Sequence, residues 1–126
     1  PRARLATMMT PTILVSDDGH ILTLGTGGSN RIRTAILQVL GRIIDEGMEP
    51  QAAVDAPRLH YENGILNAEV FGDLDAKALE SLSPENLVQF DERNLYFGGV
   101  NLAIRHPNGA LDGAGDPRRG GLCIRI

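Results

Sequence analysis

The sequence has too little cysteine for the protein classes that depend on it. Its single cysteine, Cys123, can form no internal disulfide, and one thiol cannot hold a structural zinc ion alone. Long apolar runs are also missing, since no segment approaches the roughly eighteen consecutive apolar residues of a membrane-spanning helix. Residues 1–11 (PRARLATMMTP) do not have the pattern of a signal peptide. These absences argue against disulfide scaffolds and helical membrane proteins.

Concentrated positive charge and metal-ligand spacing are missing as well. The net charge of −4 is spread along the chain, with no basic stripe interleaved with aromatics, which argues against a nucleic-acid binder. The three histidines lack the close spacing of a metal site, so we interpret them as structural or surface residues and expect no metal. They are His20, His60 and His106. With 42% apolar and 22% charged residues in 126 positions, the composition fits one globular domain.

What the sequence does contain predicts an α+β fold with mostly antiparallel strands, organised as one unit over residues 1–126. A long helix is predicted from about Ser29 to Glu46, because apolar residues recur there every three or four positions. Hairpins are predicted at residues 12–26, 59–70 and 100–116, where β-rich runs flank Asp-Gly, Asn-Gly and Pro-Asn-Gly turns. The other expected elements are a short helix between Pro50 and Pro57, a second at 75–82, and strands at 86–90 and 121–126. The last strand, GLCIRI, would bury Cys123 as a small apolar residue.

A glycine-rich loop, Gly25-Thr26-Gly27-Gly28-Ser29-Asn30, leads into the long helix. The free N–H groups and the positive dipole end of a helix start attract negative charge. One interpretation is a tight turn in which Ser29 caps the helix; another is an oxyanion hole made by two successive N–H groups. A phosphate loop is disfavoured, since no lysine follows and the sixth position of a dinucleotide motif would be Asn30. The spacing alone leaves the first two interpretations open.

Several motifs, in order, resemble the C-terminal part of the small subunit of γ-glutamyltransferases (γ-glutamyltranspeptidases). They are TMMTPTILVSDDGHILTLGTGGSNRIRTAILQVL, AVDAPRLHYENG, YFGGVNLAI and GAGDPRRGG, which together run from residue 7 to residue 121. The resemblance implies part of an N-terminal-nucleophile hydrolase, an αββα sandwich made from a precursor that cleaves itself. It also implies that a newly exposed threonine attacks a γ-glutamyl amide such as glutathione and passes the acyl group to water, an amino acid or a peptide. No metal or organic cofactor is implied.

Site residues carry over from this resemblance by position. The family's oxyanion hole is a pair of consecutive backbone N–H groups in a glycine-rich loop, and alignment of that loop places the pair at Gly28 and Ser29. Two family serines that help to bind the substrate's α-carboxylate correspond to Thr7 and Met8. Thr7 keeps a hydroxyl donor, whereas Met8 has none. A lost hydrogen bond to a charged group costs about 1.5–3 kcal/mol, which implies weaker recognition of the carboxylate or a different substrate.

Two further motifs each leave two interpretations. In DPRR, residues 116–119, an arginine (Arg118 or Arg119) is either a carboxylate binder or part of a clamp with Asp116 that orders the loop, and we favour the clamp. In DAPRLH, residues 55–60, Arg58 and His60 either touch substrate or belong to a joint between two elements, and we favour the joint.

The nucleophilic threonine of the family has no counterpart in the sequence, because it lies several tens of residues before the position of Thr7 and the chain starts at Pro1. We therefore expect a C-terminal fragment that is inactive alone. Its partners would be the large subunit and the N-terminal part of the small subunit of the same precursor, and isolated copies would self-associate. The alternatives are an inactive homologue that serves as a binding or assembly module, and a related acylase with another substrate. The compartment, periplasmic, secreted or cytoplasmic, stays open.

Overall fold

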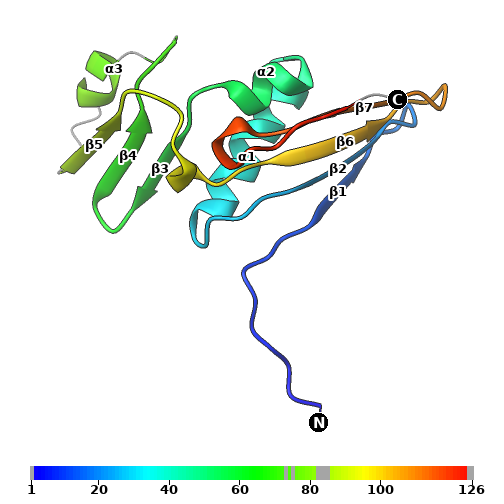
Figure 1. Cartoon of the computed structure of the whole chain (residues 1–126), viewed down its shortest axis with the longest axis horizontal. Helices are drawn as coiled ribbons and strands as arrows, with labels where there is room; N and C mark the ends of the chain where they lie inside the picture. Colours follow the sequence, from blue (N-terminus) through cyan, green and yellow to red (C-terminus); the bar gives the residue numbers. More distant parts are fainter. Residues whose placement is uncertain (1, 73, 75, 82–85, 125–126) are drawn as a thin grey trace.

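A four-stranded antiparallel sheet forms the larger part of the structure (Figure 1). The computed structural model describes residues 2–72, 74, 76–81 and 86–124. The sheet has the order β1-β2-β6-β7 and contains β1 (Thr12–Val15), β2 (Ile21–Gly25), β6 (Asn101–Arg105) and β7 (Leu111–Ala114). Each outer pair is one of the predicted hairpins, and β2 joins them by pairing with β6, with Leu22 opposite Ile104 and Leu24 opposite Leu102.

A three-stranded sheet lies at the other end of the molecule in Figure 1. It has the order β3-β4-β5, with β3 (Leu59–Glu62), β4 (Ile65–Glu69) and β5 (Asn86–Phe90). The hairpin β3–β4 turns at the predicted Asn63-Gly64 pair, and β5 pairs parallel to β4. The α+β class and the mostly antiparallel pairing are therefore confirmed.

Helix α1 (Arg31–Ile44) covers one face of the four-stranded sheet. Its buried residues Ile32, Ala35, Ile36 and Val39 follow the predicted helical spacing and pack on alternate residues of β2 and β6. Full burial of each isoleucine or valine side chain contributes about 1.5–3 kcal/mol. This layer fixes the start of α1 at the carboxyl end of β2.

Short helices complete the fold. Helix α2 (Pro50–Asp55) begins at the predicted proline. It ends before Pro57, because Ala56 has an extended backbone conformation. Helix α3 (Ala76–Ser81) falls within the predicted 75–82, whose two end positions lie outside the described residues. Two single-turn 3₁₀ helices follow, η1 (Leu95–Phe97) and η2 (Pro117–Arg119).

The predicted final strand is wrong over the described residues 121–124, which form no strand. After η2 the chain reverses at Gly120, whose φ is 65°, and then runs back over β7 without joining the sheet. A methyl group at Gly115 would meet the Leu122 nitrogen, and one at Gly113 would lie 3.2 Å from the Cys123 sulfur, so the returning segment packs closely on this part of the chain. Cys123 is consequently exposed, and the prediction that it is buried is also wrong.

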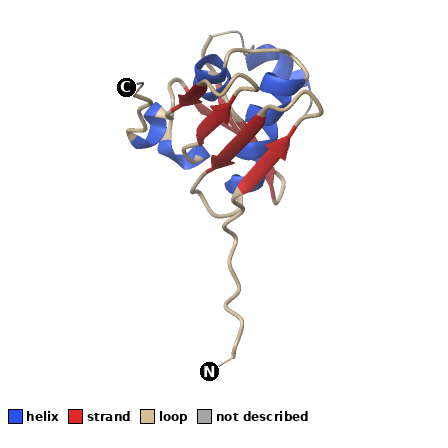
Figure 2. Ribbon diagram, turned by 90° about the vertical axis from the view of Figure 1, so that its right-hand side faces the viewer, coloured by secondary structure: helices blue, strands red, loops and turns tan. Residues whose placement is uncertain are grey.

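The face of the four-stranded sheet opposite α1 exposes large apolar side chains on its edge strands β1 and β7. Ile13, Val15 and Leu111 are 69%, 71% and 73% exposed. Residues before β1 form an extended segment that leaves the body of the molecule (Figure 2).

Candidate active site

The glycine-rich loop between β2 and α1 has an unusual backbone. Gly28 has a φ of 128°, and Ser29 has a φ of 56°, in the left-handed region. The carbonyls of Gly28 and Ser29 accept hydrogen bonds from the N–H groups of Arg31 and Ile32 at 3.1 Å each. Within the described part of the chain, the N–H groups of Gly28 and Ser29 themselves donate no hydrogen bond to another protein group. Two adjacent donors are thus free at the positive end of a helix.

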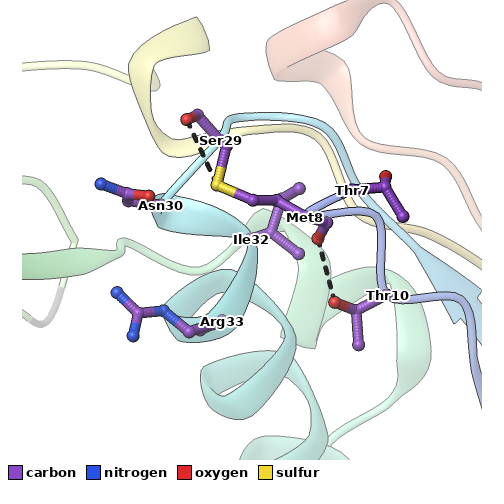
Figure 3. A pocket seen from close by; sticks show the side chains of 7 residues that line it. All are labelled: Thr7, Met8, Thr10, Ser29, Asn30, Ile32 and Arg33. Carbon is purple, nitrogen blue, oxygen red and sulfur yellow. Dashed lines mark hydrogen bonds between the residues drawn. The ribbon is translucent and has the colours of Figure 1, made fainter. Parts of the chain in front are cut away.

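The interpretation in which Ser29 caps the helix is wrong. The residue at the N-cap position is Asn30, and it makes no side-chain capping bond. The Ser29 hydroxyl points instead toward the Met8 sulfur, 3.8 Å away (Figure 3). The long helix starts later than the predicted Ser29 because the positive φ of this residue is not helical.

The segment after η1 packs directly against the loop. A methyl group at Gly98 would lie 2.4 Å from the Gly27 carbonyl oxygen, and one at Gly28 would lie 3.3 Å from the Gly98 Cα. The Gly99 N–H donates to the Thr26 hydroxyl at 2.9 Å. On the far side of the loop, the Arg31 guanidinium bonds the Tyr96 carbonyl at 3.0 Å. The YFGG motif therefore holds the loop, a role that its sequence alone did not reveal.

The other support of the loop is a polar chain from the three-stranded sheet. The Asn30 amide donates to the Glu62 carboxylate at 2.7 Å. The other Glu62 oxygen lies 3.5 Å from the His60 Nε2, and the His60 Nδ1 lies 2.9 Å from the Thr34 hydroxyl. His60 and Glu62 alternate along β3, so both face α1. This spacing is the only sequence signal that could have pointed to the pair.

The sequence-predicted residues Thr7, Met8 and Ser29 meet at one hollow of about 340 Å³. Figure 3 shows its lining, which also includes Thr10, Asn30, Ile32 and Arg33. Thr7 also lines a second hollow, of about 820 Å³, whose other walls include Gly27, Gly99 and Arg119. Met8 is 55% exposed, so its side chain belongs to the surface of the hollow and not to the core.

Arg58 and Arg118 lie in a buried charge network away from these hollows. Arg58 pairs with Asp116 at 2.7 Å, and Arg118 pairs with Glu69 and, at 3.4 Å, with Asp116. Burial lowers the pKa of Arg58. Burial also opposes the charged form of Arg118, but the hydrogen bonds and negative charges of Glu69 and Asp116 together outweigh it and raise the pKa of Arg118. The Asp116–Arg118 clamp is thus confirmed, and neither arginine is placed to bind substrate.

The described residues hold no group of three or more histidine, cysteine or acidic side chains arranged to bind a metal ion. Among the same residues, no helix is long and apolar enough to cross a membrane.

Comparison with known proteins finds similarity to gamma-glutamyltranspeptidases, glutathione hydrolase proenzymes and acylase proenzymes. The family model described as gamma-glutamyltranspeptidase matches residues 1–125. The glutathione hydrolase proenzyme of Bacillus subtilis is 34% identical over all of this chain and 21% of its own length. The acylase ACY 1 proenzyme of Pseudomonas sp. strain V22 is 33% identical over all of this chain and 22% of its own length. The crystal structure of the Bacillus anthracis transpeptidase CapD superimposes with a TM-score of 0.84 at 27% identity, over the whole chain and 75% of that chain.

The chain spans about a fifth of the length of these curated relatives. Their names mark them as proenzymes, which are proteins made as precursors and then processed.

Proposed function

Because the chain belongs to the γ-glutamyltranspeptidase family, we propose that it is the C-terminal part of an enzyme that cleaves γ-glutamyl amides such as glutathione and transfers the glutamyl group. The observation that carries the proposal is the pair of free, adjacent N–H groups at Gly28 and Ser29. They are held by a loop of fixed conformation at the start of a long helix. Such a pair is suited to bind an oxygen that becomes negative during acyl transfer.

In the proposed mechanism, the hydroxyl of an N-terminal threonine outside this chain attacks the γ-carbonyl carbon and loses its proton to the α-amine. The C=O bond electrons move onto the oxygen, which accepts hydrogen bonds from the N–H groups of Gly28 and Ser29. Collapse of this intermediate breaks the C–N bond, and the leaving amine takes up the proton. Water or an acceptor amine then attacks the ester carbon and gives its proton to the α-amine, and a second oxyanion forms at the same two N–H groups. Its collapse breaks the bond between the acyl carbon and the threonine oxygen, which takes the proton back. Each donor of this kind contributes about 10²–10³-fold to kcat.

The test is made on the full-length protein that carries this chain. Its intact mass after purification and its turnover of γ-glutamyl-p-nitroanilide are measured on one sample. We expect two fragments, the smaller beginning with threonine and containing the sequence of this chain, together with release of nitroaniline. An uncleaved and inactive protein would contradict the proposal and support the alternative of an inactive binding or assembly module.

We also propose that Thr7 and Met8 form part of the site for the substrate's α-carboxylate. Both line the 340 Å³ hollow beside Ser29, and Thr7 offers a hydroxyl donor. Met8 presents a thioether where a second hydroxyl would serve this purpose. The lack of a second hydroxyl donor favours a second candidate activity, that of an acylase with a less polar acyl group. The similarity to an acylase proenzyme agrees with this activity.

The variant M8S distinguishes these two activities. A serine would restore a donor to the carboxylate, so the preference for γ-glutamyl over 4-aminobutyryl anilide, which lacks that carboxylate, should rise about 10- to 100-fold. The preference is the ratio of kcat/KM values for the two anilides. Met9 is 74% exposed and does not line this hollow, so M9S is the control. An unchanged ratio in M8S would place the carboxylate elsewhere.

The proposed partners of this chain are the large subunit and the N-terminal part of the small subunit of the same precursor. The exposed apolar face that contains Ile13, Val15 and Leu111 is suited to be covered by them. The chain alone should be inactive and should self-associate through this face or through its sheet edges. Sedimentation velocity that showed only a compact monomer at high concentration would contradict the self-association.

A further inference from the structure

We propose that Glu62 is a positioning residue for the loop: its carboxylate holds the Asn30 side chain away from the start of α1 and so keeps the Gly28 and Ser29 N–H groups in place. The inference rests on the proposed function, because the role of Glu62 is defined by the oxyanion hole that it preserves.

Asn30 occupies the N-cap position of α1, which asparagine favours, yet its side chain does not cap the helix. A capping asparagine has an extended backbone, and its side-chain oxygen accepts from an N–H of the first helical turn. Here Asn30 has φ −60° and ψ −23°, in the helical region, and it makes no capping bond. Its amide donates instead to Glu62, 2.7 Å away on β3. The bond to Glu62 therefore replaces a cap that the sequence would otherwise favour.

Glu62 is fixed well enough to compete with capping. It follows the buried His60 on the same face of β3, and its second oxygen lies 3.5 Å from the His60 Nε2. His60 is held in turn by the Thr34 hydroxyl, one turn into the helix that Asn30 begins. The acceptor for Asn30 is thus anchored to the same helix whose start it controls.

Release of Asn30 would change the loop. To cap α1, Asn30 would have to leave the helical region for the extended one. That rotation, mainly about ψ of Asn30, swings the loop relative to the helix and breaks the turn in which Arg31 and Ile32 bond the Gly28 and Ser29 carbonyls. The two free N–H groups then point elsewhere, and the carboxamide enters the hollow that Asn30 lines. A capped helix is therefore a competing, less active conformation.

The experiment uses the full-length protein and γ-glutamyl-p-nitroanilide. E62A should lower kcat about three- to tenfold, the range expected for one capping interaction, with less than a twofold change in KM. E62Q keeps an oxygen that accepts from Asn30 and should recover most of the rate. The decisive comparison is made in an N30A background, where no side chain can cap. There E62A should cause no further fall in kcat. The control is E92A, which removes an exposed glutamate far from the loop in sequence.

Three outcomes would overturn the inference. They are an unchanged kcat in E62A, an equal fall caused by E62A with and without Asn30, and a crystal structure of E62A in which Asn30 keeps its present backbone conformation. The two kinetic outcomes require an active wild-type protein, and the structural one does not depend on activity, so all three leave the proposed function standing. An inactive wild-type protein would instead overturn the proposed function together with this inference. Denaturant unfolding of each variant shows whether a fall in rate comes from loss of folded protein.

Discussion

Ser29 holds a left-handed backbone conformation, φ 56°, in the middle of the candidate oxyanion loop. This region costs a residue with a Cβ about 1–2 kcal/mol, whereas glycine enters it freely. The hydroxyl gives little in return, because among the described residues its hydrogen-bond partner is the Met8 sulfur, 3.8 Å away. Glycine would suit this position, because it adopts a φ of 56° without the cost of a Cβ.

The variant S29G should therefore stabilise the protein and remain active. Relief of the backbone cost is partly offset by the greater flexibility of glycine in the unfolded chain, so we expect a gain of about 0.5–1 kcal/mol in the free energy of unfolding. Guanidinium unfolding of the full-length protein measures this gain. The proposed hole uses only the N–H of residue 29, so kcat should stay within about threefold of the wild-type value.

Asn63 provides the control for this prediction. It also has a positive φ, 52°, but it lies in the β3–β4 turn. Asparagine tolerates this region better than serine, so N63G should give a smaller gain than S29G and leave kcat unchanged. A loss of stability in S29G would show that the serine hydroxyl matters more than the backbone cost.

At the scale of elements, the site depends on contact between two glycine loops. Gly98 follows η1 with a φ of 82°, and a Cβ there would meet the Gly27 oxygen at 2.4 Å and the Thr26 hydroxyl at 2.7 Å. Both neighbours belong to the candidate oxyanion loop, and the Gly27 oxygen is backbone that cannot move alone. Any side chain at position 98 must therefore displace the loop.

The variant G98A should lower kcat more than tenfold and destabilise the protein by more than the roughly 1 kcal/mol expected from φ alone. Gly47 is a matched control, because it also has a positive φ, 66°, but a Cβ there would meet nothing within 4 Å. G47A should show the φ cost alone, with unchanged kcat. Equal effects of both variants on kcat would mean that the loops do not depend on each other.

Local sequence signals predicted most of the elements. The Asp-Gly, Asn-Gly and Pro-Asn-Gly turns each fix a hairpin through short-range backbone preferences, and the spacing of Ile32, Ile36 and Val39 fixes α1. GLCIRI has equally good strand composition, but strand formation also needs a partner edge. Because the chain returns over β7 after Gly120, residues 122–124 belong to neither described sheet.

The candidate site was less predictable than the elements. The loop and the positions of Thr7 and Met8 follow from the family resemblance. The contacts of Glu62 with Asn30 and of Gly98 with Gly27, in contrast, each join residues more than thirty positions apart. No periodicity or turn signal encodes such long-range pairs. The conformation of Ser29 was also hidden, because serine there predicts an ordinary cap.

At the scale of the whole molecule, buried charges connect the two sheets. Asp116, beside β7, pairs with Arg58, which comes just before β3, and also accepts from the Val100 N–H at 2.8 Å. Glu69, at the end of β4, pairs with Arg118 of η2. The side chains of Arg58 and Asp116 are fully buried, so neither partner can regain water if the other is lost.

The variant D116N should destabilise the full-length protein by about 3–5 kcal/mol, the usual cost of leaving one buried charge without its partner. The amide has nearly the shape of the carboxylate, so the loss reports the charge and its hydrogen bonds and not a cavity. Denaturant unfolding measures the change. The exposed Asp17 supplies the control, because D17N makes the same chemical change in a surface turn and should alter stability by less than about 0.5 kcal/mol. A D116N effect as small as that of D17N would contradict a structural role for the network.

The charge network also sets an order of events during synthesis. Two of its members, Arg58 and Glu69, are made early, but their partners Asp116 and Arg118 leave the ribosome some fifty residues later. Until then the nascent chain carries an arginine and a glutamate that cannot enter the interior without a large desolvation cost. The hairpins and α1 can form locally, while docking of the two sheets must wait for residues 116–118. A ribosome stalled before this point would therefore hold a chain with formed elements and open, protease-sensitive sheets.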